Sequence, residues 1–127
     1  MNFKWDDHIP PSLQSLLLTS VAKMIGSMIT QGVSNTIYGF GLMEFKWEED
    51  QLPVEFTSSI SKACVSAFSS KNPQDASQSI ANVVYALGLS NAKWDQLPPA
   101  MTRALCRGIE CWANEMTSQE LCITVYG

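Results

Sequence analysis

Apolar residues recur at helical spacing in three stretches of the chain, each of which follows a proline. Aligned on these prolines, the stretches cover residues 12–27, 54–70 and 99–114. Their shared apolar columns are Leu13, Phe56 and Met101; Leu17, Ile60 and Leu105; Val21, Cys64 and Ile109; and Met24, Ala67 and Trp112. Successive columns lie four, four and three residues apart, which places them on one face of a helix. The pattern predicts three longer helices, each with one face in the core and a proline at its start.

A second pattern alternates with the first and runs from a glutamine through apolar and small residues to a tyrosine. It occurs at 31–39, 78–86 and 119–127 and predicts three shorter helices. Its shared columns are Val33, Ile80 and Leu121; Ile37, Val84 and Val125; and the small residues Ser34, Ala81 and Cys122. The longer helices have a small column as well, at Ser20, Ala63 and Gly108. We expect Gly41 and Gly88 to end the first two shorter helices as C-terminal cap glycines.

Longer and shorter helices alternate along the chain, and the paired units recur about every 40 to 47 residues. This period is typical of helix–turn–helix arrays, in which each unit packs on its neighbours. We therefore predict an all-α fold without strands, in which helix–turn–helix repeats stack as a short right-handed α-solenoid over residues 1–127. The expected units are 1–29 and 116–127, both partial, and 30–71 and 72–115.

The first longer helix carries Leu16 and Leu18 beside its core face, where the later copies have smaller or polar residues. An extra apolar face on a terminal helix predicts a neighbouring repeat or another chain packed against these two leucines. The chain begins just before one helix and stops within a copy of the shorter pattern. We therefore expect a segment that is cut at both ends.

Aromatic residues recur at equivalent positions of the copies. They are Trp5, Trp47 and Trp94 in the Lys-Trp loops before the longer helices, and Tyr38, Tyr85 and Tyr126 in the shorter helices. Recurrence beside the core pattern predicts that these rings pack inside the fold, and stacking on nucleic-acid bases is the alternative. The lysines next to the tryptophans, Lys4, Lys46 and Lys93, are expected to pair with the adjacent acids.

Composition and charge narrow the functional classes. The chain has 127 residues, of which 46% are apolar, which is enough for one domain with a core. Its net charge of −4 contrasts with the basic footprint of a free-standing RNA binder. Four cysteines without a CxxC pair and a single histidine predict no metal, no cofactor and buried thiols, with a disulfide as the alternative. We find no catalytic motif, membrane span or targeting segment, and we predict that the chain is not an enzyme.

The stretch "SQSIANVVYALGLSNAKWDQLPPAMTRALC" resembles the octotricopeptide repeat. The residues that match its pattern in order are Gln78, Ala81, Asn82, Tyr85, Ala86, Leu87 and Gly88. The first copy matches at Gln31, Asn35, Thr36, Tyr38 and Gly41, and the last copy matches at Gln119, Leu121, Thr124, Tyr126 and Gly127. The tyrosine replaces the tryptophan of the family, Ile123 replaces its asparagine, and the units are longer. A related heptatricopeptide-type repeat of algal or protist organelles is therefore also considered.

The resemblance implies work on RNA in a chloroplast or mitochondrion. Such a protein would bind RNA in transcript stabilisation, processing or translation, or would be associated with a ribosome. The alternative is a non-enzymatic protein–protein scaffold, an accessory subunit or assembly factor of a large organellar complex, either photosynthetic or ribosomal. The acidic charge and the extra apolar face favour this alternative, and the expected partner is accordingly RNA or a protein subunit.

Positions that differ between the copies are the expected recognition sites, since a residue that reads a base or a partner should vary. The candidate binding residues, all expected to be exposed, are Gly32, Thr36, Ser79, Val83, Glu120, Thr124, Lys62, Arg103 and Arg107. We interpret the three basic residues as an ordinary solvated surface, with contact to RNA phosphates as the alternative. The structural signature is Asn35, Tyr38, Trp47, Asn82, Tyr85 and Trp94. We interpret the two identical asparagines as bonded to the neighbouring repeat, with base recognition as the alternative.

Overall fold

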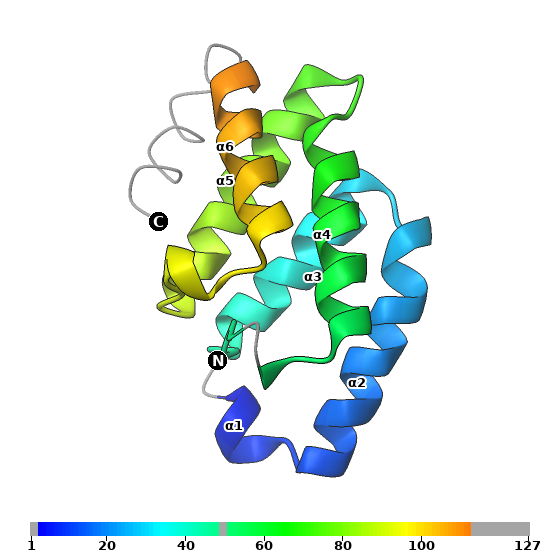
Figure 1. Cartoon of the computed structure of the whole chain (residues 1–127), viewed down its shortest axis with the longest axis vertical. Coiled ribbons are helices and arrows are strands. Elements are labelled where there is room, and N and C mark those ends of the chain that lie inside the picture. The colour runs from blue at the N-terminus through cyan, green and yellow to red at the C-terminus, as the bar shows by residue number, and fades with distance from the viewer. Residues whose placement is uncertain (1–2, 49–50, 113–127) are drawn as a thin grey trace.

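The described part of the chain is entirely helical. The computed structural model describes residues 3–48 and 51–112, and every regular element in these two ranges is a helix. The α-helices are α1 (Trp5–His8), α2 (Pro11–Met24), α3 (Thr30–Leu42), α4 (Val54–Phe68), α5 (Pro73–Leu89) and α6 (Pro99–Trp112) (Figure 1). Two 3-10 turns, η1 (Ile25–Ser27) and η3 (Trp94–Gln96), lie in the connections. The predicted all-α class is therefore confirmed for these residues.

The five longer helices form two layers. α2, α4 and α6 lie side by side in chain order, and α4 contacts both of its neighbours. α3 and α5 pack on each other behind them in the view of Figure 1, and α5 also contacts α4 and α6. Helices that are alternate in the sequence are therefore neighbours within a layer. The core lies between the two layers, where apolar side chains of both face one another.

The predicted difference in helix length holds for α3, whose 13 residues make it shorter than α2, α4 and α6, but it is wrong for α5. α5 has 17 residues and is the longest helix described, although only its 78–86 part was expected to be helical. It begins five residues before Gln78, because Asn72 caps it and Pro73 occupies its first position. The side-chain Oδ1 of Asn72 accepts hydrogen bonds from the backbone amides of Gln74 and Asp75, at 3.0 and 3.3 Å.

The two expected cap glycines lie inside helices, so this prediction is also wrong. Gly41 is buried in α3, and a Cβ added there would lie 2.6 Å from the carbonyl oxygen of Ala86 in α5. The glycine thus serves the close packing of α3 on α5. α3 ends at Leu42 and α5 ends at Leu89. Two residues beyond each end, Glu44 and Asn91 both have φ of 54° in the left-handed region. The backbone is therefore turned in the same way after both helices.

The predicted core columns are confirmed in α4 and α6. Phe56, Ile60, Cys64 and Ala67 of α4 are buried, as are Met101 and Leu105 of α6, while Ile109 and Trp112 are partly buried. Burial raises the pKa of the Cys64 thiol to about 12, because the thiolate would lose its hydration. Cys106 and Cys111 are exposed, however, so the expected burial of the thiols is wrong for these two.

The predicted core columns hold only in part in α2, where Leu17 and Val21 are partly buried and pack against the core. Leu13 and Met24 were expected in the core, but both are exposed, as is Leu16. Leu18, which was expected to face a neighbouring chain, is buried in the core instead. The physical reason is that α2 has only α4 beside it within its layer, so only one side of the helix is covered. The open side of α2 is therefore lined by Leu13, Leu16 and Met24, without Leu18.

Candidate functional site

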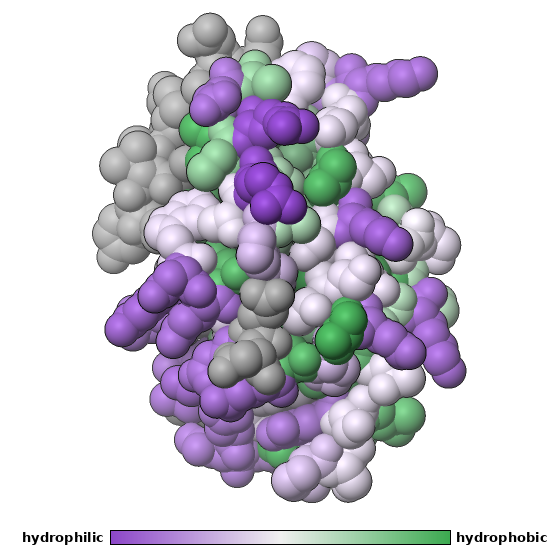
Figure 2. All heavy atoms as spheres, viewed as in Figure 1, coloured by the Kyte–Doolittle hydropathy of each residue, from purple (hydrophilic) through white to green (hydrophobic). Residues whose placement is uncertain are grey.

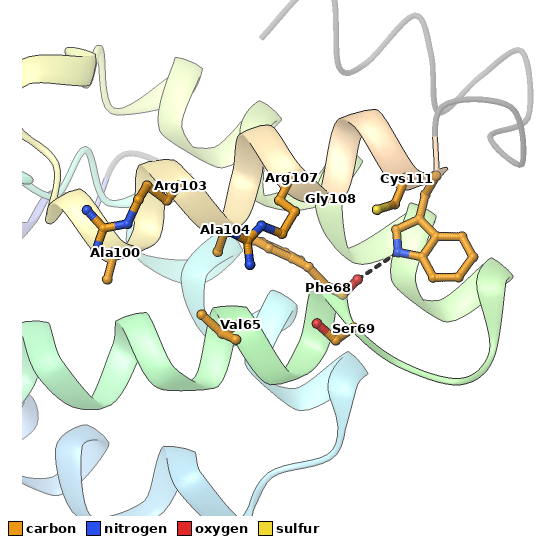
Figure 3. Close-up of a pocket in the computed structure, with 10 residues that line it drawn as sticks. Val65, Phe68, Ser69, Ala100, Arg103, Ala104, Arg107, Gly108 and Cys111 are labelled. Atoms are coloured by element: carbon orange, nitrogen blue, oxygen red, sulfur yellow. Dashed lines mark hydrogen bonds between the residues drawn. The ribbon is translucent and has the colours of Figure 1, made fainter.

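A groove of about 400 Å³ runs between α4 and α6 (Figure 3). Ala100, Ala104 and Gly108 recur every fourth residue along α6 and leave this space because their side chains are small. On α4 the groove is lined by Val65, which is 48% exposed, and by Phe68. The groove therefore has an aliphatic surface that water reaches.

Trp112 closes one end of the α4–α6 groove. Its indole Nε1–H donates a hydrogen bond of 2.7 Å to the carbonyl oxygen of Phe68, which lies at the last position of α4. This carbonyl has no partner within its own helix, because the last four carbonyls of an α-helix lack one. The bond thus fixes the C-terminal ends of α4 and α6 to each other, and Cys111 lies beside it (Figure 3).

Two arginines border the same groove. Arg103 and Arg107 lie one turn apart on α6 and are exposed. In Figure 3 the side chain of Arg107 extends from α6 toward α4. The salt bridge seen within residues 3–48 and 51–112 joins Lys4 to Glu44, at 2.9 Å, so neither arginine has a carboxylate partner there. Like charges at this spacing on a helix repel each other weakly.

The groove therefore combines apolar and cationic groups. Figure 2 shows strongly hydrophilic side chains over α6 beside hydrophobic atoms over α4, on the face formed by α2, α4 and α6. Lys62, the third predicted basic residue, is exposed on α4 but is not among the residues that line the groove. Arg103 and Arg107 are thus the two predicted binding residues that the structure brings together at a hollow.

A second, smaller groove of about 110 Å³ lies between α3 and α5 and is polar. It is lined by Gln31 and Asn35 of α3, by the equivalent Gln78 and Asn82 of α5, and by Asp75. Neither asparagine side chain makes a hydrogen bond within the described residues, so the interpretation of a bond to the neighbouring repeat finds no support there. The carboxamides of both copies instead face one shared groove.

Two of the predicted recognition residues are buried. Ser79 and Val83 lie in the interior, and the Ser79 hydroxyl donates a 3.5 Å hydrogen bond to the carbonyl oxygen of Thr30. The expectation that they are exposed is wrong, because α3, α4 and α6 all pack on α5 and cover most of its surface. The spacing of residues within one helix does not predict how many other helices pack against it.

The matching residues of α3 are partly buried. The Thr36 hydroxyl donates a hydrogen bond of 2.8 Å to the carbonyl oxygen of Gly32. The same hydroxyl oxygen lies 3.5 Å from Met28 Sδ. A Cβ added at Gly32 would lie 3.2 Å from Cβ of Met28. Both predicted residues therefore face the connection before α3. The remaining two, Glu120 and Thr124, lie outside the described residues, as do Ile123 and Tyr126.

The recurring aromatic residues divide into two groups. Trp5 and Trp47 are buried, and the rings of Tyr38 and Tyr85 stack on each other with centroids 6.1 Å apart, so their predicted packing is confirmed. Trp94 is 53% exposed, and for this residue the prediction of packing is wrong. The predicted pairing of lysines with adjacent acids is replaced, at Lys4, by a pair with Glu44 in the next loop. This contact raises the pKa of Lys4 and lowers the pKa of Glu44.

Neither a metal centre nor a known relative narrows the function. Within the described ranges, no group of three His, Cys, Asp or Glu residues is arranged to hold a metal ion. No helix there has both the length and the apolar character that crossing a membrane requires. Comparison with protein-family models, with curated proteins and with solved structures gives no match. The resemblance to octotricopeptide repeats therefore stays a prediction.

Proposed function

We propose that this chain is a non-enzymatic protein–protein scaffold, built as a short α-solenoid of stacked helical repeats that packs against another protein at its end. The observation that carries the proposal is the open apolar side of α2. Leu16 and Met24 on this side are 61% and 59% exposed, which is unusual for large apolar side chains that lie on one face of a helix.

The alignment on the prolines says what this side of α2 is equivalent to. Leu16 and Met24 correspond to Ala104 and Trp112 of α6. In α6 these two residues face the preceding helix of the layer, since Ala104 lines the α4–α6 groove and Trp112 bonds to Phe68. The equivalent positions of α2 are therefore stacking positions, but α2 has no preceding helix. A helix of a partner protein would complete the layer there.

The loop between α5 and α6 offers a similar argument at the other end of the stack of helices. Trp5 packs against Phe40 of α3 and against Phe45 in the loop after α3, at ring-centroid distances of 5.7 and 5.0 Å. The equivalent Trp94 is exposed, over a small hollow that it shares with Leu87 and other apolar residues. A scaffold that continues into a partner would supply the missing contact.

Binding to RNA has less support from the residues. Two of its predicted recognition positions, Ser79 and Val83, are buried, and the net charge of −4 opposes the approach of phosphates. The place of the scaffold in a chloroplast or mitochondrial complex, photosynthetic or ribosomal, rests on the family resemblance alone.

The proposal is tested with the variant Leu16→Glu/Met24→Glu, expressed with a tag in the source organism. Wild-type chain should migrate with a large complex on a native gradient, and RNase treatment should not release it. The variant should migrate as the free chain, because two carboxylates cannot be buried in an apolar interface without a large cost. The matched control is Ser58→Glu/Gln74→Glu, which adds the same charge at exposed positions of α4 and α5. Release by RNase, or no difference between the two variants, contradicts the proposal.

A further inference from the structure

We propose that the α4–α6 groove binds an acidic peptide segment of a partner protein, with one apolar side chain seated between the helices and its carboxylates on Arg103 and Arg107. The inference rests on the proposed function, since it assigns a second partner site to the same scaffold. It concerns a different surface from the open side of α2 and is therefore tested separately.

The apolar part of the site has the size and the lining that a side chain requires. Its volume of about 400 Å³ lies within the range of ordinary ligand pockets. Ala104 and Gly108 form one wall, and Val65 and Phe68 form part of the other, so the lining between the helices is mainly apolar. Covering the exposed Val65 with a leucine or phenylalanine side chain would remove apolar surface from water on both partners.

The charged part of the site selects an acidic partner. Arg103 and Arg107 have no carboxylate partner within the described residues, although the chain carries more acidic than basic residues. Glu110 on the same helix makes no ion pair with either of them. A guanidinium group presents paired N–H donors that match the two oxygens of a carboxylate. A partner carboxylate between the arginines would also relieve the repulsion between them.

A peptide fits this groove better than RNA does. Single-stranded nucleic acid requires exposed aromatic rings for its bases and a track of cations for its phosphates. The two aromatic residues that line the groove offer no exposed ring, because Phe68 is buried and Trp112 is half-buried with its indole N–H bonded to the carbonyl oxygen of Phe68. Charge complementarity and an aliphatic wall together therefore point to an acidic segment with an apolar anchor.

The test is selection of binders to the full chain from a random library of dodecamer peptides, followed by anisotropy titrations of the selected peptides. The expected consensus joins Asp or Glu to Leu, Ile or Phe. Arg103→Glu/Arg107→Glu should weaken binding about tenfold or more, because both cations become repulsive. Ala104→Phe should also weaken it, because the added ring fills the groove while both arginines remain. Lys23→Glu/Lys46→Glu, with the same charge change at exposed residues outside the groove, should bind as the wild type does.

Several outcomes would overturn the inference. It fails if the selected peptides show no acidic preference, or if they bind equally to the wild type and to Arg103→Glu/Arg107→Glu. It also fails if a mixed-sequence RNA of twenty nucleotides binds the wild type and loses its affinity in that variant, because the groove would then be a nucleic-acid site. Leu16→Glu/Met24→Glu should bind the peptides normally. The test of peptide binding in the α4–α6 groove is therefore independent of the test of the α2 surface.

Discussion

Trp47 and Trp94 occupy the same position of two copies of one sequence pattern, yet Trp47 is 2% exposed and Trp94 is 53% exposed. The backbone before them is alike, since Glu44 and Asn91 both have φ of 54°. The difference lies in the neighbours. Trp47 packs against the ring of Phe45 at a centroid distance of 4.9 Å, whereas the equivalent residue of the second copy is Ala92.

The other residues around the two tryptophans are also aromatic in the first copy and not aromatic in the second. The rings of Phe40 and Phe56, whose centroids lie 5.8 Å apart, complete the aromatic cluster around Trp47. Leu87 and Met101 take their places in the second copy. The recurring pattern thus produces the same backbone turn in both copies. Whether its side chains are buried depends on the neighbouring residues, which differ between the copies. The exposed copy is the one available to a partner.

The largest effect is expected from removing each tryptophan in turn. Trp47→Ala should lower the free energy of unfolding by about 3–5 kcal/mol, because it leaves a cavity among aromatic rings. Trp94→Ala should lower it by less than about 1 kcal/mol, because the ring is mostly in water. Urea unfolding of the two variants measures both values. Equal losses in the free energy of unfolding would show that Trp94 packs as Trp47 does and would contradict the difference between the two residues.

A smaller difference is expected at the two glycines. Gly41→Ala should cost about 1–3 kcal/mol, because the added Cβ overlaps the backbone of Ala86 and forces α3 away from α5. The equivalent Gly88 is exposed inside α5, so Gly88→Ala should be neutral or stabilising by up to about 1 kcal/mol. Thermal unfolding of both variants decides the matter. A loss at Gly88 as large as that at Gly41 would contradict this assignment.

The smallest effect is expected from giving Trp94 the partner that it lacks. Ala92→Phe places a ring where Phe45 stands in the first copy and should stabilise the fold by about 0.5–1.5 kcal/mol. The emission of Trp94 should shift to shorter wavelength, which is measured best in a Trp5→Phe/Trp47→Phe/Trp112→Phe background, where Trp94 is the remaining tryptophan. Unchanged emission would mean that the loop geometry, and not the missing aromatic residue, keeps Trp94 exposed.

The sequence predicts local structure better than it predicts surroundings. The apolar columns locate α4 and α6 and identify Ile60 and Leu105 as core residues, because helical spacing is a local property. The same columns fail at Met24, because α2 lies at the edge of its layer. Ser79 fails for the opposite reason, since α5 has neighbours on several sides. The number of neighbours of a helix is not encoded in its own periodicity.

The candidate site follows the same rule. The basic character of Arg103 and Arg107 is visible in the sequence, as is the small residue Gly108. The groove itself is not, because it requires α6 to lie beside Val65 of α4 at a distance that small side chains leave unfilled. A signal that would have located it is the recurrence of small residues every fourth position from Ala100, next to two arginines on the same helix.

The central claim is that the open side of α2 contacts a protein, and site-specific photo-crosslinking tests it most directly. A photoreactive benzoylphenylalanine replaces Leu16 in one variant and the exposed Gln74 of α5 in a control. Irradiation in the source organism should give a protein adduct from position 16, resistant to RNase, and little adduct from position 74. An RNase-sensitive adduct at position 16, or equal yields from the two positions, would contradict the account.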